Sequence, residues 1–417
     1  MNRRTVIKGL LAGVAAGGFR VPLVHAADYT GKFFAFVQAA GGWDPTSFCD
    51  PKVNTPGEPV INHWAVEDEI RQAGDIPYAP FASNEAFFEK YHDQMLVING
   101  VDAQTNSHTI GTIHNWSGRS SEGYPTTTAL LAAHHGPDAP VAYLTFGGFS
   151  YPAGVIRTTR LDNTELLQAL AAPATGPLGR YFSDADWTAL EAYASETANR
   201  LGEFRELIPS ESRRLADYRS AFAAEGLKDF ADAIDNIRPQ SGLRRQAQLA
   251  VLGFRTGAAV SADLILGGFD THANHDDTHA GRLAQLTEGV DYLWDFAEAE
   301  GVADRLVVVM GSDFGRTNYY NAGDGKDHWP IGSFVVMEKN QSWTDRAVGE
   351  TDEMHFAQRI DPATLTRNSA DGTVIHPKHV HKALRRYLGV EASAGAERFP
   401  FDGTEDFAFF DDPGADP

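Results

Sequence analysis

The sequence contains a single cysteine, Cys49, so the chain cannot form an internal disulfide. After its first 26 residues it has no run of the roughly 18 consecutive apolar residues that a membrane helix needs. Basic residues are scarce as well: 35 Lys and Arg stand against 56 Asp and Glu, which gives a formal net charge of −21. A surface this acidic repels nucleic acid and anionic membranes, and we expect neither as a partner.

The chain does have enough apolar sequence for a large core. Its 417 residues include 42% hydrophobic and 11% aromatic side chains, which excludes a disordered chain and a small disulfide-stapled scaffold. The length allows two or three domains, or one large α/β domain.

The first 26 residues have the pattern of an export signal. Arg3 and Arg4 precede a short apolar stretch that runs to Gly18, and Val24-His25-Ala26 offers small residues for cleavage. The arginine pair predicts the twin-arginine route, with an ordinary secretory signal as the alternative. We therefore expect the twin-arginine export machinery as a partner, and a mature protein of residues 27–417 that is periplasmic or secreted.

Five short apolar runs predict buried strands, because near-continuous apolar runs are typical of parallel strands covered on both faces. The runs are residues 32–38, 95–99, 263–266, 306–310 and 334–337. Amphipathic stretches of helical period lie between them. The clearest are residues 187–206, 213–225, 243–260 and 279–300.

This alternation predicts a single α/β domain with a doubly wound, mainly parallel sheet. The helix-rich segment of about 162–239 has no strand candidate, and we expect it to form an inserted helical cap. The acidic segment of about 399–417 is expected to be a loose C-terminal tail.

Polar side chains follow or precede each predicted strand. In open α/β sheets the functional site lies outside the carboxyl ends of the strands, so these side chains are expected to meet at one rim. They are Asp44 after the first strand, Ser107 and His108 after the second, Asp270, His272 and His275 after the third, Asp313 and Arg316 after the fourth, and Asp327 and His328 just before the fifth.

Carboxylates and neutral imidazoles bind divalent ions, and carboxylates crowded at one rim would repel each other without a cation. We therefore predict one or two divalent ions, of zinc, manganese, magnesium or calcium. In this hypothesis Ser107, or otherwise a metal-bound water, is the nucleophile, His108 or His272 moves protons, and Arg316 holds an anionic oxygen. The predicted metal ligands are Asp44, Asp270, His272, His275, Asp313, Asp327 and His328.

Plainer alternatives remain open for these residues. Asp44 and Asp313 could cap a turn or helix, Ser107 could cap a loop, and Arg316 could pair with a carboxylate. His279 is expected on a solvated helix face. Three C-terminal histidines are expected at a helix start and along its face: His376, His379 and His381.

Other catalytic motifs are incomplete or missing. Cys49-Asp50-Pro51 matches the start of the sulfatase Cys-x-Pro-x-Arg signature, but Val53 stands at the arginine position, so we expect Cys49 to be a buried thiol. The sequence contains no G-x-S-x-G elbow, no Walker loop and no G-x-G-x-x-G after a strand. These absences disfavour lipase-like, nucleotide-hydrolysing and dinucleotide-binding functions.

With the arginine pair at its start, the chain resembles the family catalogued as domain of unknown function 1501. The motifs that carry this resemblance are Gly-Gly-Trp-Asp44, Ser107-His108, Gly-Phe-Asp270-Thr-His272, Ser-Asp313-Phe-Gly-Arg316-Thr and Asp327-His328-Trp329. The family is grouped with the alkaline phosphatase superfamily, so the resemblance implies that superfamily's sheet and a one- or two-metal site at its rim.

The resemblance also suggests a role for each motif. Asp44 looks like the metal aspartate of the first strand, and Ser107 lies near the expected place of the nucleophile. Asp270 and His272 look like the ligand pair of one metal. Asp313 looks like the aspartate of the second metal, and His328 like a late histidine ligand.

The sequence departs from the phosphatase pattern in two places. Phe314 stands where phosphatases have a histidine after the second-metal aspartate. Asn274 stands four residues after Asp270, where another histidine ligand would be, so that His272 or His275 would have to serve.

The resulting hypothesis is an exported metal-dependent hydrolase or transferase that acts on a phosphate or sulfate ester, of a small molecule or of an envelope glycan or lipid. The helical cap would lie over the rim and select the leaving group. The alternative is a non-catalytic periplasmic protein of the same fold that binds metal or glycan within a larger assembly, and Phe314 favours it.

Overall fold

The computed structural model describes residues 29–171, 183–204, 206–221 and 224–411. The predicted export signal at residues 1–26 lies outside these segments, as do the last six residues of the predicted tail. None of the helices in the described segments combines the length and apolar character of a membrane span.

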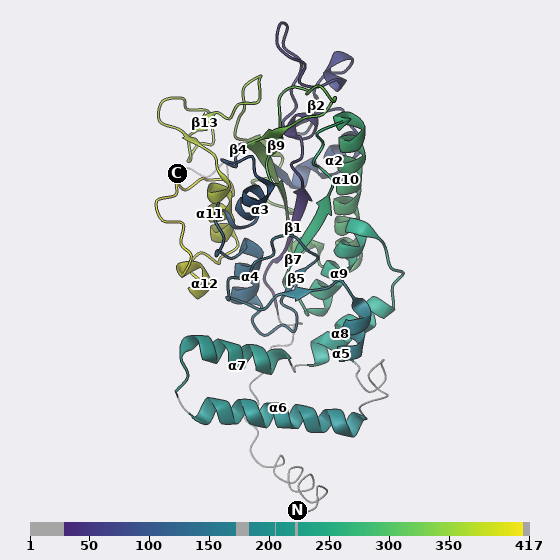
Figure 1. Ribbon diagram of the computed structural model, residues 1–417, viewed down its shortest axis with the longest axis vertical. Coiled ribbons are helices and arrows are strands. Elements are labelled where there is room, and N and C mark those ends of the chain that lie inside the picture. The colour runs from purple at the N-terminus through teal and green to yellow at the C-terminus, as the bar shows by residue number, and fades with distance from the viewer. Residues whose placement is uncertain (1–28, 172–182, 205, 222–223, 412–417) are drawn as a thin grey trace, which may run out of the picture.

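An eight-stranded sheet forms the centre of the molecule, with strand order β12-β4-β11-β8-β1-β7-β5-β6 (Figure 1). All five predicted strands belong to it: β1 (Phe33–Ala40), β4 (Met95–Asp102), β7 (Ser261–Gly267), β8 (Leu306–Ser312) and β11 (Ile331–Met337). The other three strands are β5 (Tyr143–Thr145), β6 (Thr159–Arg160) and β12 (Arg346–Val348), with β6 and β12 at the two edges.

Seven of these strands run in one direction. β8, β1, β7, β5 and β6 pair in parallel, and β12 pairs in parallel with β4. Strand β11 runs antiparallel to both β4 and β8, between which it lies. The predicted α/β class with a doubly wound, mainly parallel sheet is therefore confirmed.

Both faces of the sheet are covered, as the apolar runs predicted. Alternate residues of β1 enter opposite cores: Phe33, Ala35 and Val37 pack on one side, and Phe34 and Phe36 on the other. One face carries α2 (Asn84–Tyr91), α9 (Gly242–Thr256) and α10 (His275–Ala299). The other carries α3 (His108–Ser117), α4 (Thr127–His135) and α11 (Pro377–Tyr387).

Short elements complete the described chain. Three two-stranded ribbons are β2 (Arg71–Ala73) with β3 (Ile76–Tyr78), β9 (Gly315–Arg316) with β10 (His328–Trp329), and β13 (Arg359–Ile360) with β14 (Thr373–Val374). Short helical turns are η2 (Pro45–Ser47), η3 (Trp64–Val66), η4 (His92–Gln94), η5 (Ala303–Arg305) and α12 (Ala394–Glu397).

The predicted helical insertion is present. Its described parts form α5 (Thr164–Ala171), α6 (Asp184–Phe204), α7 (Pro209–Ala221) and α8 (Ala224–Asp235). The expectation that it lies over the rim of the site is wrong. Phe230 of α8 packs against Gly253 of α9, and the next residue of α9, Phe254, stacks on Phe33 at the start of β1. The insertion thus lies at the amino ends of the strands, far from β9 and β2 at the other end (Figure 1).

The expected loose tail is also corrected in its described part. Phe407 and Phe409 are fully buried in the core under α11, and Phe401 is nearly so. These aromatic rings hold residues 399–411 against the domain, because burying each of them removes a large apolar area from water.

The buried histidines predict that acid destabilises this fold, and His381 in α11 is the clearest case. Its Nε2 donates to the carbonyl oxygen of Asn115 at 2.7 Å, and its Nδ1 lies 2.8 Å from the hydroxyl of Thr127. Burial lowers the pKa of His381 from 6.5 to about 3. Below pH 6.5 the unfolded chain therefore takes up a proton that the folded chain refuses, and stability falls until about pH 3.

We predict that His381→Asn is less stable than the wild type at pH 7.5 but loses stability more slowly on acidification. The difference in slope is about 1.4 kcal/mol per pH unit between pH 6 and pH 4. Urea unfolding across this pH range measures it. An unchanged slope in His381→Asn would contradict the prediction.

Candidate functional site

Three histidines and one aspartate meet at the carboxyl ends of the strands. We call His108, Asp270, His272 and His328 the rim cluster. Their side chains come from the start of α3, the loop after β7 and strand β10. The Nε2 atoms of His108, His272 and His328 lie 3.3, 3.0 and 3.3 Å from Oδ1 of Asp270, and those of His272 and His328 are 3.0 Å apart.

Each imidazole of the rim cluster is held in its orientation by a hydrogen bond at its Nδ1 atom, on the side of the ring away from Asp270. Nδ1 of His108 lies 2.8 Å from Asp313, and that of His272 lies 2.7 Å from Asp327. Nδ1 of His328 donates to the carbonyl oxygen of Asn106 at 2.8 Å. Carbonyl and carboxylate oxygens only accept hydrogen bonds, so each neutral ring carries its proton on Nδ1 and turns the lone pair of Nε2 toward Asp270.

This arrangement fits a metal ion. A tetrahedral ion with ligands at 2.0–2.1 Å separates its ligand atoms by about 3.3 Å, close to the 3.0–3.3 Å found between these Nε2 atoms and Asp270. The ligand atoms of His108, Asp270 and His328 all lie within 4.8 Å of one another. Nε2 of His108 is buried without a hydrogen-bond partner, as expected of an atom whose partner is a metal ion.

The electrostatics of the rim cluster favour positive charge at its centre. Burial alone raises the pKa of Asp270, but the hydrogen bond and charge of Arg316 outweigh it and lower the pKa to about 2. The hydrogen bond to Asp313 raises the pKa of His108, although burial opposes this shift. Asp270 therefore stays ionised over the whole physiological range, as a metal ligand must.

Close backbone approach brings the loops together. Gly41, at the end of β1, has φ +118°, and a Cβ atom there would lie 2.5 Å from the backbone nitrogen of Asp270. Only glycine allows both the conformation and the contact. On the other side, the ring of Phe314 packs 4.9 Å from that of His108 and 4.7 Å from that of His328, measured between centroids.

Arg316 is a positioning residue for this site. Its side chain is fully buried, and its donors bind the carbonyl oxygens of Gly41, Gly42 (2.8 Å) and Lys326 (3.0 Å) and the carboxylate of Asp270 (2.7 Å). Because these partners use its Nε and both terminal nitrogens, Arg316 holds the end of β1 and the loop before β10 against Asp270. The predicted role of holding a substrate oxygen does not fit a guanidinium committed in this way.

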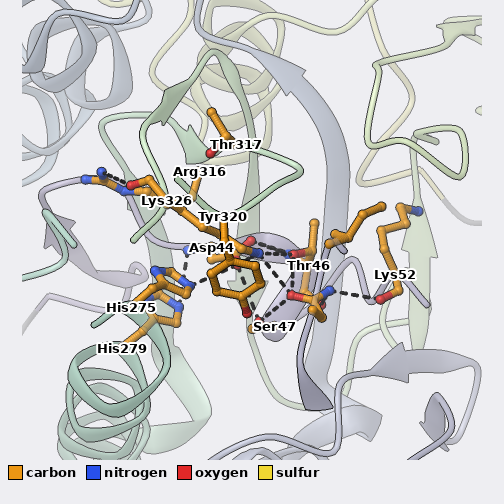
Figure 2. Close-up of polar contacts among 12 residues, drawn as sticks. Asp44, Thr46, Ser47, Lys52, His275, His279, Arg316, Thr317, Tyr320 and Lys326 are labelled. Atoms are coloured by element: carbon orange, nitrogen blue, oxygen red, sulfur yellow. Dashed lines mark hydrogen bonds and ion pairs between the residues drawn. The ribbon is translucent and has the colours of Figure 1, made fainter. Parts of the chain in front are cut away.

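A second cluster lies deeper, and Figure 2 shows its polar contacts. We call Asp44, Thr46, Asn62, His275 and Lys326 the buried cluster. Nζ of Lys326 lies 2.6 Å from Oδ2 of Asp44, and neither side chain is exposed to solvent. Burial alone raises the pKa of Asp44, but Lys326 and His275 hold it well below its usual range.

His275 belongs to the buried cluster and not to the rim. Its Nε2 lies 3.2 Å from Asp44 and its Nδ1 lies 2.7 Å from the hydroxyl of Thr271. His279 follows one turn later in α10, and its Nε2 accepts the backbone N–H of Asp44 at 3.2 Å. The expectation that His279 lies on a solvated helix face is wrong, because α10 turns this face toward η2 and the side chain is fully buried.

The structure thus divides the seven predicted metal ligands into three groups. Asp270, His272 and His328 meet in the rim cluster, together with His108, which was predicted to move protons. Asp313 and Asp327 accept hydrogen bonds from Nδ1 of His108 and His272, respectively, and so orient these two rings. Asp44 and His275 are apart from these residues, in the buried cluster.

The remaining predicted residues have simpler positions. Ser107 is exposed at the N-cap of α3, directly before His108, and stays a predicted nucleophile. Cys49 is a fully buried thiol, as expected, and burial raises its pKa. His376 and His379 form a capping box at the start of α11, also as expected.

Sequence reasoning missed Lys326 and the burial of His279. Lys326 directly precedes the Asp327-His328 motif in a glycine-rich loop, where a lysine is usually solvated. His279 lies four residues after His275, on the same face of a helix, and this spacing was the available signal that both enter one environment.

Comparison with known proteins gives one family match. Residues 217–384 match the family model described as "Protein of unknown function (DUF1501)", which confirms the resemblance predicted from the motifs. This segment contains Asp270, His272, Asp313 and His328, whereas Asp44 and His108 lie before it. No curated protein matches the chain in sequence.

Similar solved structures include a sulfatase from Pseudoalteromonas sp. (11% identity, 99% of this chain and 76% of that one, TM-score 0.41). Others are the lipoteichoic acid synthase LtaP from Listeria monocytogenes (9%, 93% and 79%, 0.35) and the phosphonate monoester hydrolase of Agrobacterium radiobacter (12%, 86% and 74%, 0.33).

The position of Arg316 predicts a large stability effect. Arg316→Met leaves three backbone carbonyl oxygens without their donors, and we expect the free energy of unfolding to fall by about 2–4 kcal/mol. Urea unfolding of the metal-free protein measures the loss. Arg71→Met, at an exposed position, is the matched control and should change stability by less than about 0.5 kcal/mol. Equal stability of the two variants would contradict the positioning role.

Proposed function

We propose that this chain, which carries the domain of unknown function 1501 over residues 217–384, is a metal-dependent hydrolase or transferase of phosphate or sulfate esters. The observation that carries the proposal is the rim cluster: the ligand atoms of His108, Asp270 and His328 lie within 4.8 Å of one another at the carboxyl ends of the strands, and Nε2 of His272 lies 3.0 Å from Asp270 beside them. Ligand sites of open α/β sheets lie at this edge.

The donor set narrows the choice of ion. Magnesium and calcium prefer oxygen ligands, whereas three imidazoles with one carboxylate suit zinc or a related transition metal such as manganese. Of the four ions expected from the sequence, we therefore propose zinc or manganese. When bound, such an ion would polarise the ester and offset negative charge on its oxygens.

The chain's own residues would hold and orient this centre. Asp313 and Asp327 fix the rings of His108 and His272, and Arg316 fixes Asp270. The side chains of Asp270 and His272 are 45% and 46% exposed, so a substrate can reach the cluster from solvent.

Ser107 is the proposed nucleophile because of its place beside the cluster. It is exposed, it precedes His108, and within the described residues no hydrogen bond engages its hydroxyl group. The start of α3 also favours negative charge on an oxygen at this point. The export signal expected at residues 1–26 would bring the protein to esters of envelope glycans and lipids.

A non-catalytic metal-binding protein is the second candidate, and one observation favours it. Structural zinc sites use four protein ligands, whereas catalytic sites keep one position open. Beside the three candidate ligands His108, Asp270 and His328, Nε2 of His272 lies 3.0 Å from Asp270 and would close the fourth position, so this alternative predicts that the protein binds the ion without turnover.

Removing an orienting carboxylate should weaken metal binding. We predict that Asp313→Asn lowers the affinity for Zn²⁺ about 10–100-fold, because Asp313 fixes the ring and the proton of His108. Isothermal titration calorimetry of the metal-free protein measures the affinity. Asp371→Asn, at an exposed position outside the site, should bind as the wild type does. An unchanged affinity in Asp313→Asn would remove His108 from the ligand set.

Turnover is the direct test of the proposed function. The purified protein, loaded in turn with zinc and manganese, is assayed on aryl phosphates, aryl phosphodiesters and aryl sulfates. We expect turnover of at least one class, reduced more than about 100-fold in His328→Ala, since loss of a ligand exceeds loss of an orienting partner. His92→Ala is the control. Bound metal without turnover would favour the non-catalytic alternative, and turnover that survives in His328→Ala would contradict the proposed site.

A further inference from the structure

The proposed function leaves one fully buried charge pair without a role, that of Asp44 and Lys326. Besides its contact of 2.6 Å with Asp44, Nζ of Lys326 lies 3.0 Å from Oδ1 of Asn62 and 3.3 Å from the hydroxyl of Thr46 (Figure 2). Three oxygen atoms therefore surround the ammonium group, as they would surround a small cation.

The carboxylate of Asp44 has no free lone pair for another cation. Its Oδ1 accepts the backbone N–H of Thr46 at 3.0 Å and the hydroxyl of Thr46 at 2.7 Å. Its Oδ2 binds Lys326 and lies 3.2 Å from Nε2 of His275. An ionised carboxylate offers about four acceptor positions, and here all four have partners.

The ammonium group is also closed off from solvent. The ring of Tyr320 lies over Nζ of Lys326, 5.1 Å from its centroid, and stacks at 3.9 Å on the ring of His63. The hydroxyl of Tyr320 donates to Asp276 at 2.7 Å, which ties this cover to the first turn of α10. Tyr320 thus forms part of the cover over this ammonium group, whose side chain has no exposed surface.

A second observation concerns the space beside the rim cluster. Phe314 follows Asp313 directly, and its buried ring fills the space beside His108 and His328. Asp313 itself is committed to Gln38, to the N–H of Gly41 and to His108. Phe314 and Asp313 thus offer no free ligand atom for a further ion on this side of the rim cluster.

We propose that the ammonium group of Lys326 is a built-in cation in place of a second metal ion beside Asp44, so that the protein binds a single divalent ion, at the rim cluster. This inference rests on the proposed function and adds the number and position of the ions. It also gives Asp44 a structural role: by holding Lys326, Asp44 anchors the segment that continues into Asp327 and His328.

A double-mutant cycle in metal-free protein tests the charge pair. Asp44→Asn and Lys326→Met each leave one buried charge without its partner, and we expect each Tm to fall by about 5–10 °C. The double variant removes both charges and should recover most of this loss. The exposed pair of Lys90 and Asp291, with the same 2.6 Å contact, is the matched control, and its cycle should show shifts below about 2 °C.

Metal counting tests the number of ions. After loading with excess Zn²⁺ and gel filtration, elemental analysis should give one ion per chain for the wild type and for the double variant, and none for the double substitution His272→Ala/His328→Ala. Two ions in the wild type, loss of the ion in Asp44→Asn/Lys326→Met, or a double variant no more stable than the single variants would overturn the inference. A wild type that binds no divalent ion would overturn the proposed function instead.

Discussion

The site depends on one electrostatic constraint: the Nε2 atoms of three histidines lie 3.0–3.3 Å from one carboxylate oxygen of Asp270, while the Nδ1 atom of each ring faces an acceptor on its other side. Positive charge at this point, from a metal ion or from an added proton, would offset the repulsion between these lone pairs. Other residues of the rim maintain this arrangement. Arg316 fixes Asp270, and the carboxylates of Asp313 and Asp327 fix the rings of His108 and His272.

The sheet and the rim could be predicted from the sequence because both follow from local patterns. A buried parallel strand needs a near-continuous apolar run, and the polar residues after such runs must emerge at the same edge. The five strands and the meeting of Asp270, His272 and His328 were therefore predictable. The role of each residue within the site was not, because it depends on neighbours far away in the chain.

Asp44 illustrates that difference. After a strand and two glycines, an aspartate is a reasonable metal ligand, yet its partner is Lys326, 282 residues away. The same holds for the insertion: periodicity predicts the helices α5 to α8, but the end of the sheet at which they lie is set by the packing of α8 on α9. Neither contact leaves a pattern in the local sequence.

Helix α10 runs along the sheet from its carboxyl edge to its amino edge (Figure 1). Its 25 residues run from His275, in the buried cluster, to Ala299, next to the turn where Glu300 pairs with Arg255 of α9. At 1.5 Å per residue the helix is about 37 Å long. Helices α6 and α7 lie beyond the amino ends of the strands, so they leave the solvent side of the rim cluster uncovered (Figure 1).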